Sequence, residues 1–211
     1  MKNIGLFIVL FFLIISCSST KFIDSWKNDQ VKVFTPNKLL VVGMTDNLTA
    51  RKIFEKELSE AFIKRGINAK QSIEVFNNSF TTSKKTELEI NEMIVKLSKD
   101  GYDAVIITAL KGEDEKRIFT DRFYTVDYKW TRFGRYYYRF QDIYYTPNYS
   151  ETYTVYHVET SIYNIDEDEN KSLVWVGVLD IVDPQKISST VKSYASKIII
   201  QMEKENLIMK R

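Results

Sequence analysis

The chain has 211 residues, 44% of them hydrophobic and 27% charged, and a formal net charge of +2. This length and composition fit one globular domain, and they exclude an intrinsically disordered chain and a protein with many membrane spans. The near-neutral charge gives no support to a nucleic-acid binder, and a single cysteine excludes an internal disulfide or a cysteine-based metal site.

Residues 1–16 have the layout of an export signal. Lys2 supplies a positive charge, residues 4–15 form an apolar stretch, and Ser16 precedes Cys17. A membrane-spanning helix needs about 20 apolar residues, so the stretch is too short to be one. We therefore predict a signal peptide over residues 1–16, which is removed in the mature protein.

The segment Ile14-Ile15-Ser16-Cys17 resembles the lipobox of bacterial lipoproteins, in which an apolar, a variable and a small residue precede the modified cysteine. In that family the cysteine sulfur carries a diacylglyceryl group, and a fatty acid such as palmitate is usually added to the new amino terminus. The resemblance implies lipidation at Cys17. Two or more acyl chains give stable anchoring, whereas one chain binds only marginally. The alternative is an ordinary signal peptide with an incidental cysteine.

The residue after the cysteine bears on the destination of a lipoprotein. Ser18 stands there, and in Gram-negative sorting a residue other than Asp favours the outer membrane. Residues 18–21 also lack the acidic cluster that directs some lipoproteins to the cell surface. For a Gram-negative source, the resemblance implies a lipid anchor in the outer membrane, with the domain in the cell envelope and facing the periplasm.

The rest of the chain is predicted to form a polar tether over residues 17–37 and a single domain over residues 38–211. The first half of that domain alternates apolar strand patterns with amphipathic helices. Strands are expected at residues 38–45, 67–76 and 103–110, with helical periodicity from Ala50 to Phe62 and a capping box formed by Thr86 and Glu89.

The second half begins with a tyrosine-rich insertion at about residues 120–150, and ten of the thirteen tyrosines lie between Tyr124 and Tyr156. Two strand patterns at 152–165 and 172–182 predict a long β-hairpin, and Asp183 with Pro184 is expected to open a C-terminal helix. The predicted fold class is α/β (α+β): a mixed sheet built from a βαβαβ half, the hairpin and the last helix.

The strand, polar loop and helix from Leu39 to Gly66 (LLVVGMTDNLTARKIFEKELSEAFIKRG) resemble the opening unit of the TolB N-terminal domain and of CsgG-like periplasmic domains. The likeness covers roughly residues 38–110. It implies an α/β fold and an envelope compartment.

Signatures of catalysis are largely missing from the sequence. It has no GxSxG elbow, no P-loop and no GxGxxG, so nucleotide sites and the common nucleophile sites are unsupported. His157 is the only histidine, which excludes a multi-histidine metal site and makes any Ser-His-Asp arrangement depend on that residue. We interpret His157 as a structural or surface residue and expect no cofactor, no metal and no nucleotide.

Two acidic segments resemble parts of functional sites. Asp166, Asp168 and Asn170 alternate like the first ligands of an EF-hand, but Lys171 and Gly177 stand where the loop needs Gly and Glu. A solvated hairpin turn is the favoured interpretation, with weak cation binding as the alternative. Residues 113–115 are acidic and are interpreted as a charged strand end, against the alternative of a carboxylate site.

The candidate site residues are Cys17 for lipidation and, for partner binding, Tyr136, Tyr137, Tyr138, Arg139, Tyr144 and Tyr145. Tyr and Arg offer large, rigid contact surfaces with polar tips, which is why they are frequent in binding hot spots. The competing interpretation is an insertion whose tyrosines pack on the sheet or face water.

These observations predict a non-enzymatic envelope lipoprotein that contacts an envelope protein or glycan through the Tyr/Arg-rich segment, in addition to the membrane, and that binds no nucleic acid. The alternatives are a small envelope hydrolase acting on glycan or lipid, and a subunit of a secretion or assembly complex.

Overall fold

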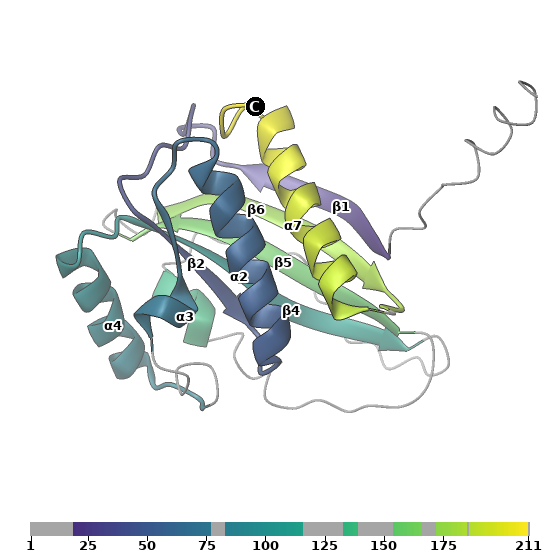
Figure 1. The fold of residues 1–211 in the computed structure, drawn as a ribbon. Helices are drawn as coiled ribbons and strands as arrows, with labels where there is room; N and C mark the ends of the chain where they lie inside the picture. Colours follow the sequence, from purple (N-terminus) through teal and green to yellow (C-terminus); the bar gives the residue numbers. More distant parts are fainter. Residues whose placement is uncertain are drawn as a thin grey trace, which may run out of the picture.

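The computed structural model describes residues 19–76, 83–115, 133–138, 154–165, 172–184 and 186–210. In these ranges one mixed β-sheet carries helices on both faces (Figure 1). None of the helices in them has the length and hydropathy that crossing a membrane requires.

Six strands of the described residues make up the sheet. They are β1 (Thr20–Lys27), β2 (Leu39–Met44), β3 (Ala69–Gln71), β4 (Ala104–Glu115), β5 (Thr154–Asn164) and β6 (Leu173–Val182). Their order across the sheet is β1-β6-β5-β4-β2-β3. β2 runs parallel to both β3 and β4, whereas β4, β5, β6 and β1 pair antiparallel in turn.

The helices divide between the two faces of the sheet. They are α2 (Leu48–Ile63), α3 (Ser72–Val75), α4 (Glu87–Lys99) and α7 (Ile187–Lys204), and residues 133–138 are also helical. α2 and α7 lie side by side on one face (Figure 1), with an edge-on contact between the rings of Phe54 and Tyr194. α4 and residues 133–138 pack on the opposite face.

The predicted fold class is confirmed. β2, α2, β3, α4 and β4 form the βαβαβ half, β5 and β6 form the hairpin, and α7 follows it. The tyrosine-rich insertion lies between β4 and β5 in the sequence, and only its residues 133–138 are described.

Helix starts follow the local sequence where a capping side chain is present. The Asn47 side chain accepts the backbone N–H of Ala50 at 2.9 Å and so caps α2. The capping box before α4 is confirmed: Thr86 Oγ1 accepts the N–H of Glu89 at 3.2 Å, and the Glu89 carboxylate accepts the N–H of Thr86 at 2.8 Å. The hydrogen bonds that the Thr86 backbone N–H and hydroxyl donate to the carboxylate lower the pKa of Glu89.

Two predicted element boundaries were wrong. The strand expected over residues 67–76 ends at Gln71, because the chain turns there into α3. The last helix begins at Ile187 rather than at Pro184. Asp183 has φ of 40° and donates its N–H to the Thr154 carbonyl at 3.0 Å, so it extends the strand pairing instead of capping a helix.

The predicted tether over residues 17–37 also needs correction, because Thr20–Lys27 is an edge strand paired with β6. A β-bulge between Phe22 and Asp24 shifts the register, so Phe22 packs against one hydrophobic cluster and Trp26 against the other. The bulge breaks the simple alternation of apolar and polar residues by which a strand is recognised in a sequence.

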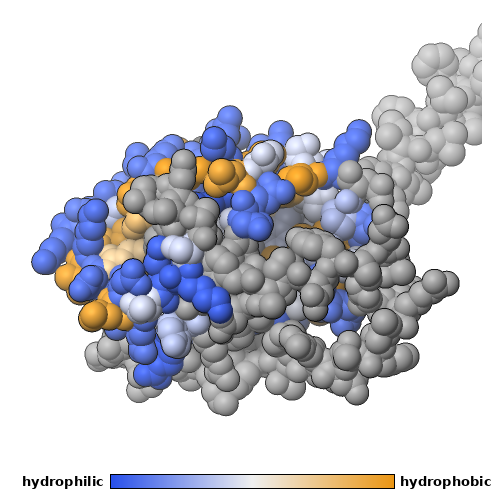
Figure 2. Space-filling model, turned by 90° about the horizontal axis from the view of Figure 1, so that it is seen from below, coloured by the Kyte–Doolittle hydropathy of each residue, from blue (hydrophilic) through white to orange (hydrophobic). Residues whose placement is uncertain are grey.

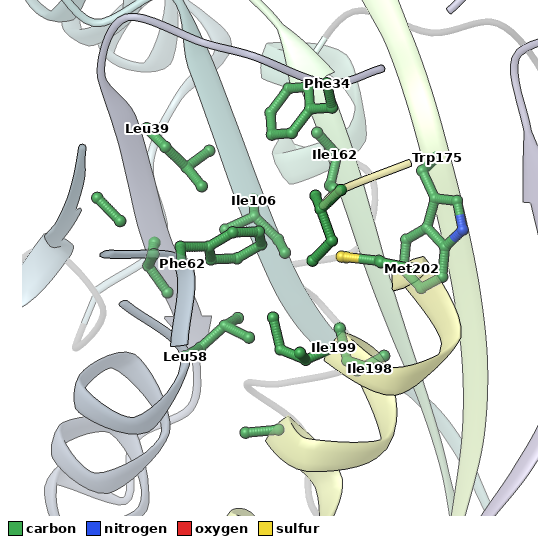
Figure 3. Close-up of a cluster of buried hydrophobic side chains, with 14 of the residues drawn as sticks. Phe34, Leu39, Leu58, Phe62, Ile106, Ile162, Trp175, Ile198, Ile199 and Met202 are labelled. Carbon is green, nitrogen blue, oxygen red and sulfur yellow. The ribbon is translucent and has the colours of Figure 1, made fainter. Parts of the chain in front are cut away.

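The larger hydrophobic core lies between the sheet and the α2–α7 pair. Figure 3 shows the side chains that meet there, including Leu58, Phe62, Ile106, Ile162, Trp175, Ile198, Ile199 and Met202. Trp175 is fully buried, and its indole lies over Gly177, where a Cβ would come within 2.1 Å of the ring atom Cη2. The indole Nε1 donates to Glu205 at 2.6 Å, which fixes the ring in this place.

A second cluster fills the opposite face. It contains Val105 and Ile107 of β4, Ile90 and Leu97 of α4, and three aromatic residues of the insertion, Phe133, Tyr136 and Tyr137. Gly134 allows the close approach of residues 133–138 to α4, since a Cβ there would lie 3.0 Å from Ile94 Cδ1.

Candidate functional site

A row of polar side chains crosses β4, β5 and β6 on the face that carries α4. We call it the polar row and define it as Lys111, Asp114, His157, Glu159 and Asp180. His157 and Glu159 are two positions apart in β5 and therefore share a face, and Asp180 is the strand partner of His157 in β6. A register shift between Leu110 and Gly112 lies beside Lys111 in β4.

Glu159 is a buried carboxylate that ties the insertion to the sheet. Its Oε1 accepts the Tyr136 hydroxyl at 2.6 Å and the Ser161 hydroxyl at 3.1 Å, and Lys111 Nζ lies 3.4 Å away. Lys111 also stands 4.9 Å from the centroid of the Tyr136 ring. Together these contacts compensate for burying the carboxylate and hold Tyr136 against the sheet.

Tyr136 stays protonated in this environment. Burial, followed by the nearby charge of Glu159, raises the pKa of its phenol well above the usual value. The phenol therefore acts as a hydrogen-bond donor to Glu159, in keeping with a role in mounting the insertion on the sheet.

His157 bridges two strands through both ring nitrogens. Nδ1 lies 2.6 Å from Asp180 Oδ1, and Nε2 lies 3.1 Å from Asp114 Oδ2. Burial lowers the pKa of His157, but the hydrogen bonds to Asp114 and Asp180 and their charges outweigh that effect, and the net shift is upward. Two carboxylate partners favour the imidazolium, which can donate from both nitrogens.

This geometry differs from a Ser-His-Asp arrangement, in which one histidine nitrogen faces the nucleophile and the other faces the carboxylate. In the described residues, both nitrogens of His157 contact aspartates. Within the same ranges, no group of three or more His, Cys, Asp and Glu side chains is arranged to hold a metal ion. The chemistry that the polar row offers is charge and hydrogen bonding.

The structure separates the tyrosines that the sequence grouped together. Tyr136 and Tyr137 are buried, at 5% and 2% exposure, whereas Tyr138 is 47% exposed. Phe133 and Tyr137 contact each other edge-on, and Phe133 and Tyr136 both contact the Tyr163 ring of β5. Of the three consecutive tyrosines, Tyr136 and Tyr137 are therefore part of the core, and Tyr138 is not.

The remaining predicted site residues cannot be placed. Cys17, Arg139, Tyr144 and Tyr145 lie outside the described residues, as does the acidic turn with Asp166, Asp168 and Asn170. The acidic segment 113–115 forms the end of β4, in agreement with its interpretation as a charged strand end.

Sequence reasoning missed Lys111, Glu159 and Asp180 as members of the row. A signal was present for one of them, because Glu159 interrupts the long strand pattern and a charged residue in an inner strand needs partners. Its partners come from β4 and from the insertion, 48 and 23 positions away, so sequence spacing could not indicate them.

A second buried charge pair lies on the other face, under the start of α2. Arg51 and Glu55 are both fully buried and 2.9 Å apart. Glu55 also accepts the N–H groups of Gly43 and Ile73 and the hydroxyl of Ser72, at 3.0, 2.9 and 2.6 Å. This network joins β2, α2 and α3 through bonds within the protein, as expected of a structural element.

Comparison with known proteins finds similar solved structures but no matching family or curated relative. No protein-family model matches the chain, and no curated protein matches its sequence. Similar solved structures include two of PelC dodecamers from Paraburkholderia phytofirmans, with 10% identity and TM-scores of 0.40 and 0.42, covering 89% and 90% of this chain and 98% and 99% of theirs.

Another similar structure is that of the lipoprotein GNA1162 from Neisseria meningitidis. It has 10% identity and a TM-score of 0.40, and the match covers 80% of this chain and 99% of that one. The neighbours thus include a bacterial lipoprotein.

Proposed function

We propose that the chain is a lipid-anchored protein of the cell envelope with a non-enzymatic binding role. Cys17 carries the anchor, in the outer membrane and facing the periplasm, and the outer side of residues 133–138 contacts an envelope protein or glycan. The lipobox-like segment before Cys17 supports the anchor. The arrangement of residues 133–138 supports the binding role.

The observation that carries the binding role is that the helical residues 133–138 have both buried aromatic side chains and exposed ones. Phe133, Tyr136 and Tyr137 are buried and hold the segment on the sheet, while Tyr138 is 47% exposed and Arg135 is exposed as well. A Tyr ring and an Arg side chain on a firmly packed segment lose little conformational entropy on binding, which favours their use in recognition.

This arrangement refines the set of contact residues. We assign Tyr136 and Tyr137 to mounting the segment and Tyr138 to contacting the partner, and we keep Arg139, Tyr144 and Tyr145 as proposed contacts. The polar row lies between residues 133–138 and the sheet at this point, since Tyr136 is bonded to Glu159.

The test is site-specific photo-cross-linking of the full-length protein in intact cells. A cross-linking amino acid at position 138 should capture one defined partner, and the same group at Val95 should not. Val95 is a matched control because it is 53% exposed and lies on α4, where apolar patches alternate with hydrophilic ones at the left of Figure 2. Equal capture at both positions, or capture at neither, would overturn the binding surface.

The anchor is tested separately. Cys17→Ala should abolish metabolic labelling of the protein by a fatty-acid analogue. Labelling that persists in this variant would contradict lipidation at Cys17, whatever the cross-linking experiment shows.

A further inference from the structure

The folded domain begins almost at the proposed lipid attachment point. Ser19 accepts the N–H of Val182 on its carbonyl at 2.7 Å, and its hydroxyl lies 3.2 Å from that of Thr190. The next residue, Thr20, is 3% exposed, and its hydroxyl lies 2.6 Å from that of Ser193. From Ser19 onward, the chain is bonded to β6 and to the first turns of α7.

Little chain is left between this point and the anchor. Two peptide units separate Cys17 from Ser19, and consecutive Cα atoms are 3.8 Å apart, so the two Cα atoms are at most about 7.6 Å apart. This limit holds for any conformation of the intervening residue. A lipid on Cys17 must therefore lie next to Ser19, and the membrane surface must lie close to the part of the domain that surrounds Ser19.

That part is one end of the sheet, which we call the anchor end. It contains the start of β1 and the end of β6, where Thr20 pairs with Ile181, and the start of β5, where Val155 pairs with Val182. The first two turns of α7 are there too, through Thr190 and Ser193. Figure 1 shows the start of β1 on the same side of the molecule as the ends of β4 and β6.

The opposite end of the sheet is far from the anchor. It contains the starts of β2 and β4 and the end of α4, where Asp103 accepts the backbone N–H of Lys38 at 3.0 Å. β4 has twelve residues. At about 3.3 Å per residue, it separates the two ends by roughly 35 Å.

We infer that the domain is held with its anchor end against the lipid surface and its opposite end pointing away. The inference rests on the proposed lipid anchor at Cys17 and adds an orientation to it. The side chains at the anchor end suit this contact without demanding a charged bilayer: Ile187 is 44% exposed, and exposed Lys21 and Lys186 are accompanied by exposed Asp183. The covalent lipid, rather than net charge, sets the orientation.

The orientation also brings the polar row near the membrane. His157 pairs with Asp180, which in turn pairs with Lys21 of β1, one residue from Thr20. A partner that approaches His157 must therefore do so near the headgroups, from the side of the sheet that carries α4.

The experiment uses the lipidated full-length protein in vesicles. Its only cysteine is Cys17, whose sulfur is blocked by the lipid, so one introduced cysteine can be labelled with a fluorescent donor. Ser188→Cys places the donor at the first turn of α7, and Lys99→Cys places it at the end of α4; both positions are exposed. Energy transfer to an acceptor dye on lipid headgroups reports the height of each donor above the membrane.

We expect strong transfer from position 188 and several-fold weaker transfer from position 99, in phosphatidylcholine vesicles with or without phosphatidylglycerol. A ten-residue Gly/Ser linker inserted between Ser18 and Ser19 should reduce the difference, because such a linker has an end-to-end distance of roughly 18 Å. Transfer that is equal at both positions in the chain without the linker would overturn the orientation.

The outcomes separate the orientation from the anchor. Protein that carries the fatty-acid label and floats with vesicles, but shows equal transfer, leaves the anchor intact and refutes the orientation. Protein without the label refutes the anchor and, with it, the orientation. A difference that appears only with phosphatidylglycerol would mean that charge, and not the short connection, orients the domain, and would also overturn the inference.

Discussion

The two faces of the sheet are built differently. The α2–α7 face has two helices in contact along their length, and its charged pair Arg51–Glu55 is fully buried. The α4 face has one helix, the helical residues 133–138 and the polar row, in which His157 keeps a third of its side chain exposed. The α2–α7 face holds the larger hydrophobic cluster. The α4 face combines a smaller cluster with polar side chains, among them a histidine whose charge depends on pH.

The largest expected effect is on the α2–α7 face. Arg51→Met removes the cation beside Glu55 and leaves a carboxylate in a fully buried place. Removing one partner of a buried ion pair costs about 3–5 kcal/mol. Urea unfolding of the mature chain with Cys17→Ser should show this loss, and the double variant Arg51→Met/Glu55→Gln should regain part of it. A loss below about 1 kcal/mol would mean that the pair is not needed for this face.

Next in size is Gly177→Ala, again on the α2–α7 face. The new methyl group would lie within 2.1 Å of the Trp175 ring, which is fully buried and bonded to Glu205. Overpacking of this kind costs about 1–3 kcal/mol, and we expect the upper end.

Gly134→Ala is the control on the other face. The new methyl group would lie 3.0–3.3 Å from the side chains of Ile94, Asn91 and Ile90, which need to shift by only a few tenths of an ångström, and Ala favours a helix over Gly. We therefore expect the free energy of unfolding in urea to change by less than about 1 kcal/mol. Equal losses in both variants would remove this contrast between the faces.

A smaller effect is expected where the insertion is mounted on the α4 face. Tyr136→Phe deletes the hydroxyl that Glu159 accepts at 2.6 Å, while Ser161 and Lys111 remain. Loss of a bond to a buried charged group costs about 1–3 kcal/mol, and the remaining donors favour the lower end. Tyr138→Phe, at an exposed position, should have almost no effect on urea unfolding. If the two variants were equally stable, the Tyr136 hydroxyl would not hold the insertion.

The smallest effect is a dependence of stability on pH. The pKa of His157 is raised in the folded protein, so the folded state binds the proton more tightly than the unfolded state does. The contribution is therefore complete below the unfolded pKa, about 6.5, and is lost as the pH rises through the folded value. Unfolding midpoints measured at several pH values across this window should fall less steeply for His157→Gln than for the parent chain. Parallel pH profiles would show that the bridge to Asp114 and Asp180 does not stabilise the fold.

The parts of the fold that the sequence predicts are those encoded locally. The Thr86–Glu89 capping box joins two residues three positions apart, and the apolar strand Leu39–Met44 is a run of 6 residues. Both are found in the structure. The two strands of the hairpin are found as well, with ends that differ from the predicted ones by at most two residues. Local patterns suffice for these elements because the spacing of apolar residues and the capping of a helix depend only on residues close together in the chain.

The candidate site depends on long-range pairing, and sequence reasoning could not assemble it. His157 joins residues of β4 and β6 that lie 43 and 23 positions away. For the run Tyr136-Tyr137-Tyr138, composition indicates an aromatic surface, but which rings face the sheet depends on the partner Glu159 and on the contact of Gly134 with α4. The prediction that this segment binds a partner stays a prediction.

The pairing of β1 with β6 has a consequence for the order of folding. Thr20 meets Ser193, 173 positions further along the chain, so the first strand of the domain cannot complete its contacts until the last helix is available. Contacts of such large sequence separation form slowly, because closing a long loop costs entropy before any contact compensates for it. When the chain is synthesised or exported with its N-terminal end first, we expect β1 to remain unpaired while the rest of the sheet forms. The residues just before β1 would stay accessible to processing enzymes during that interval.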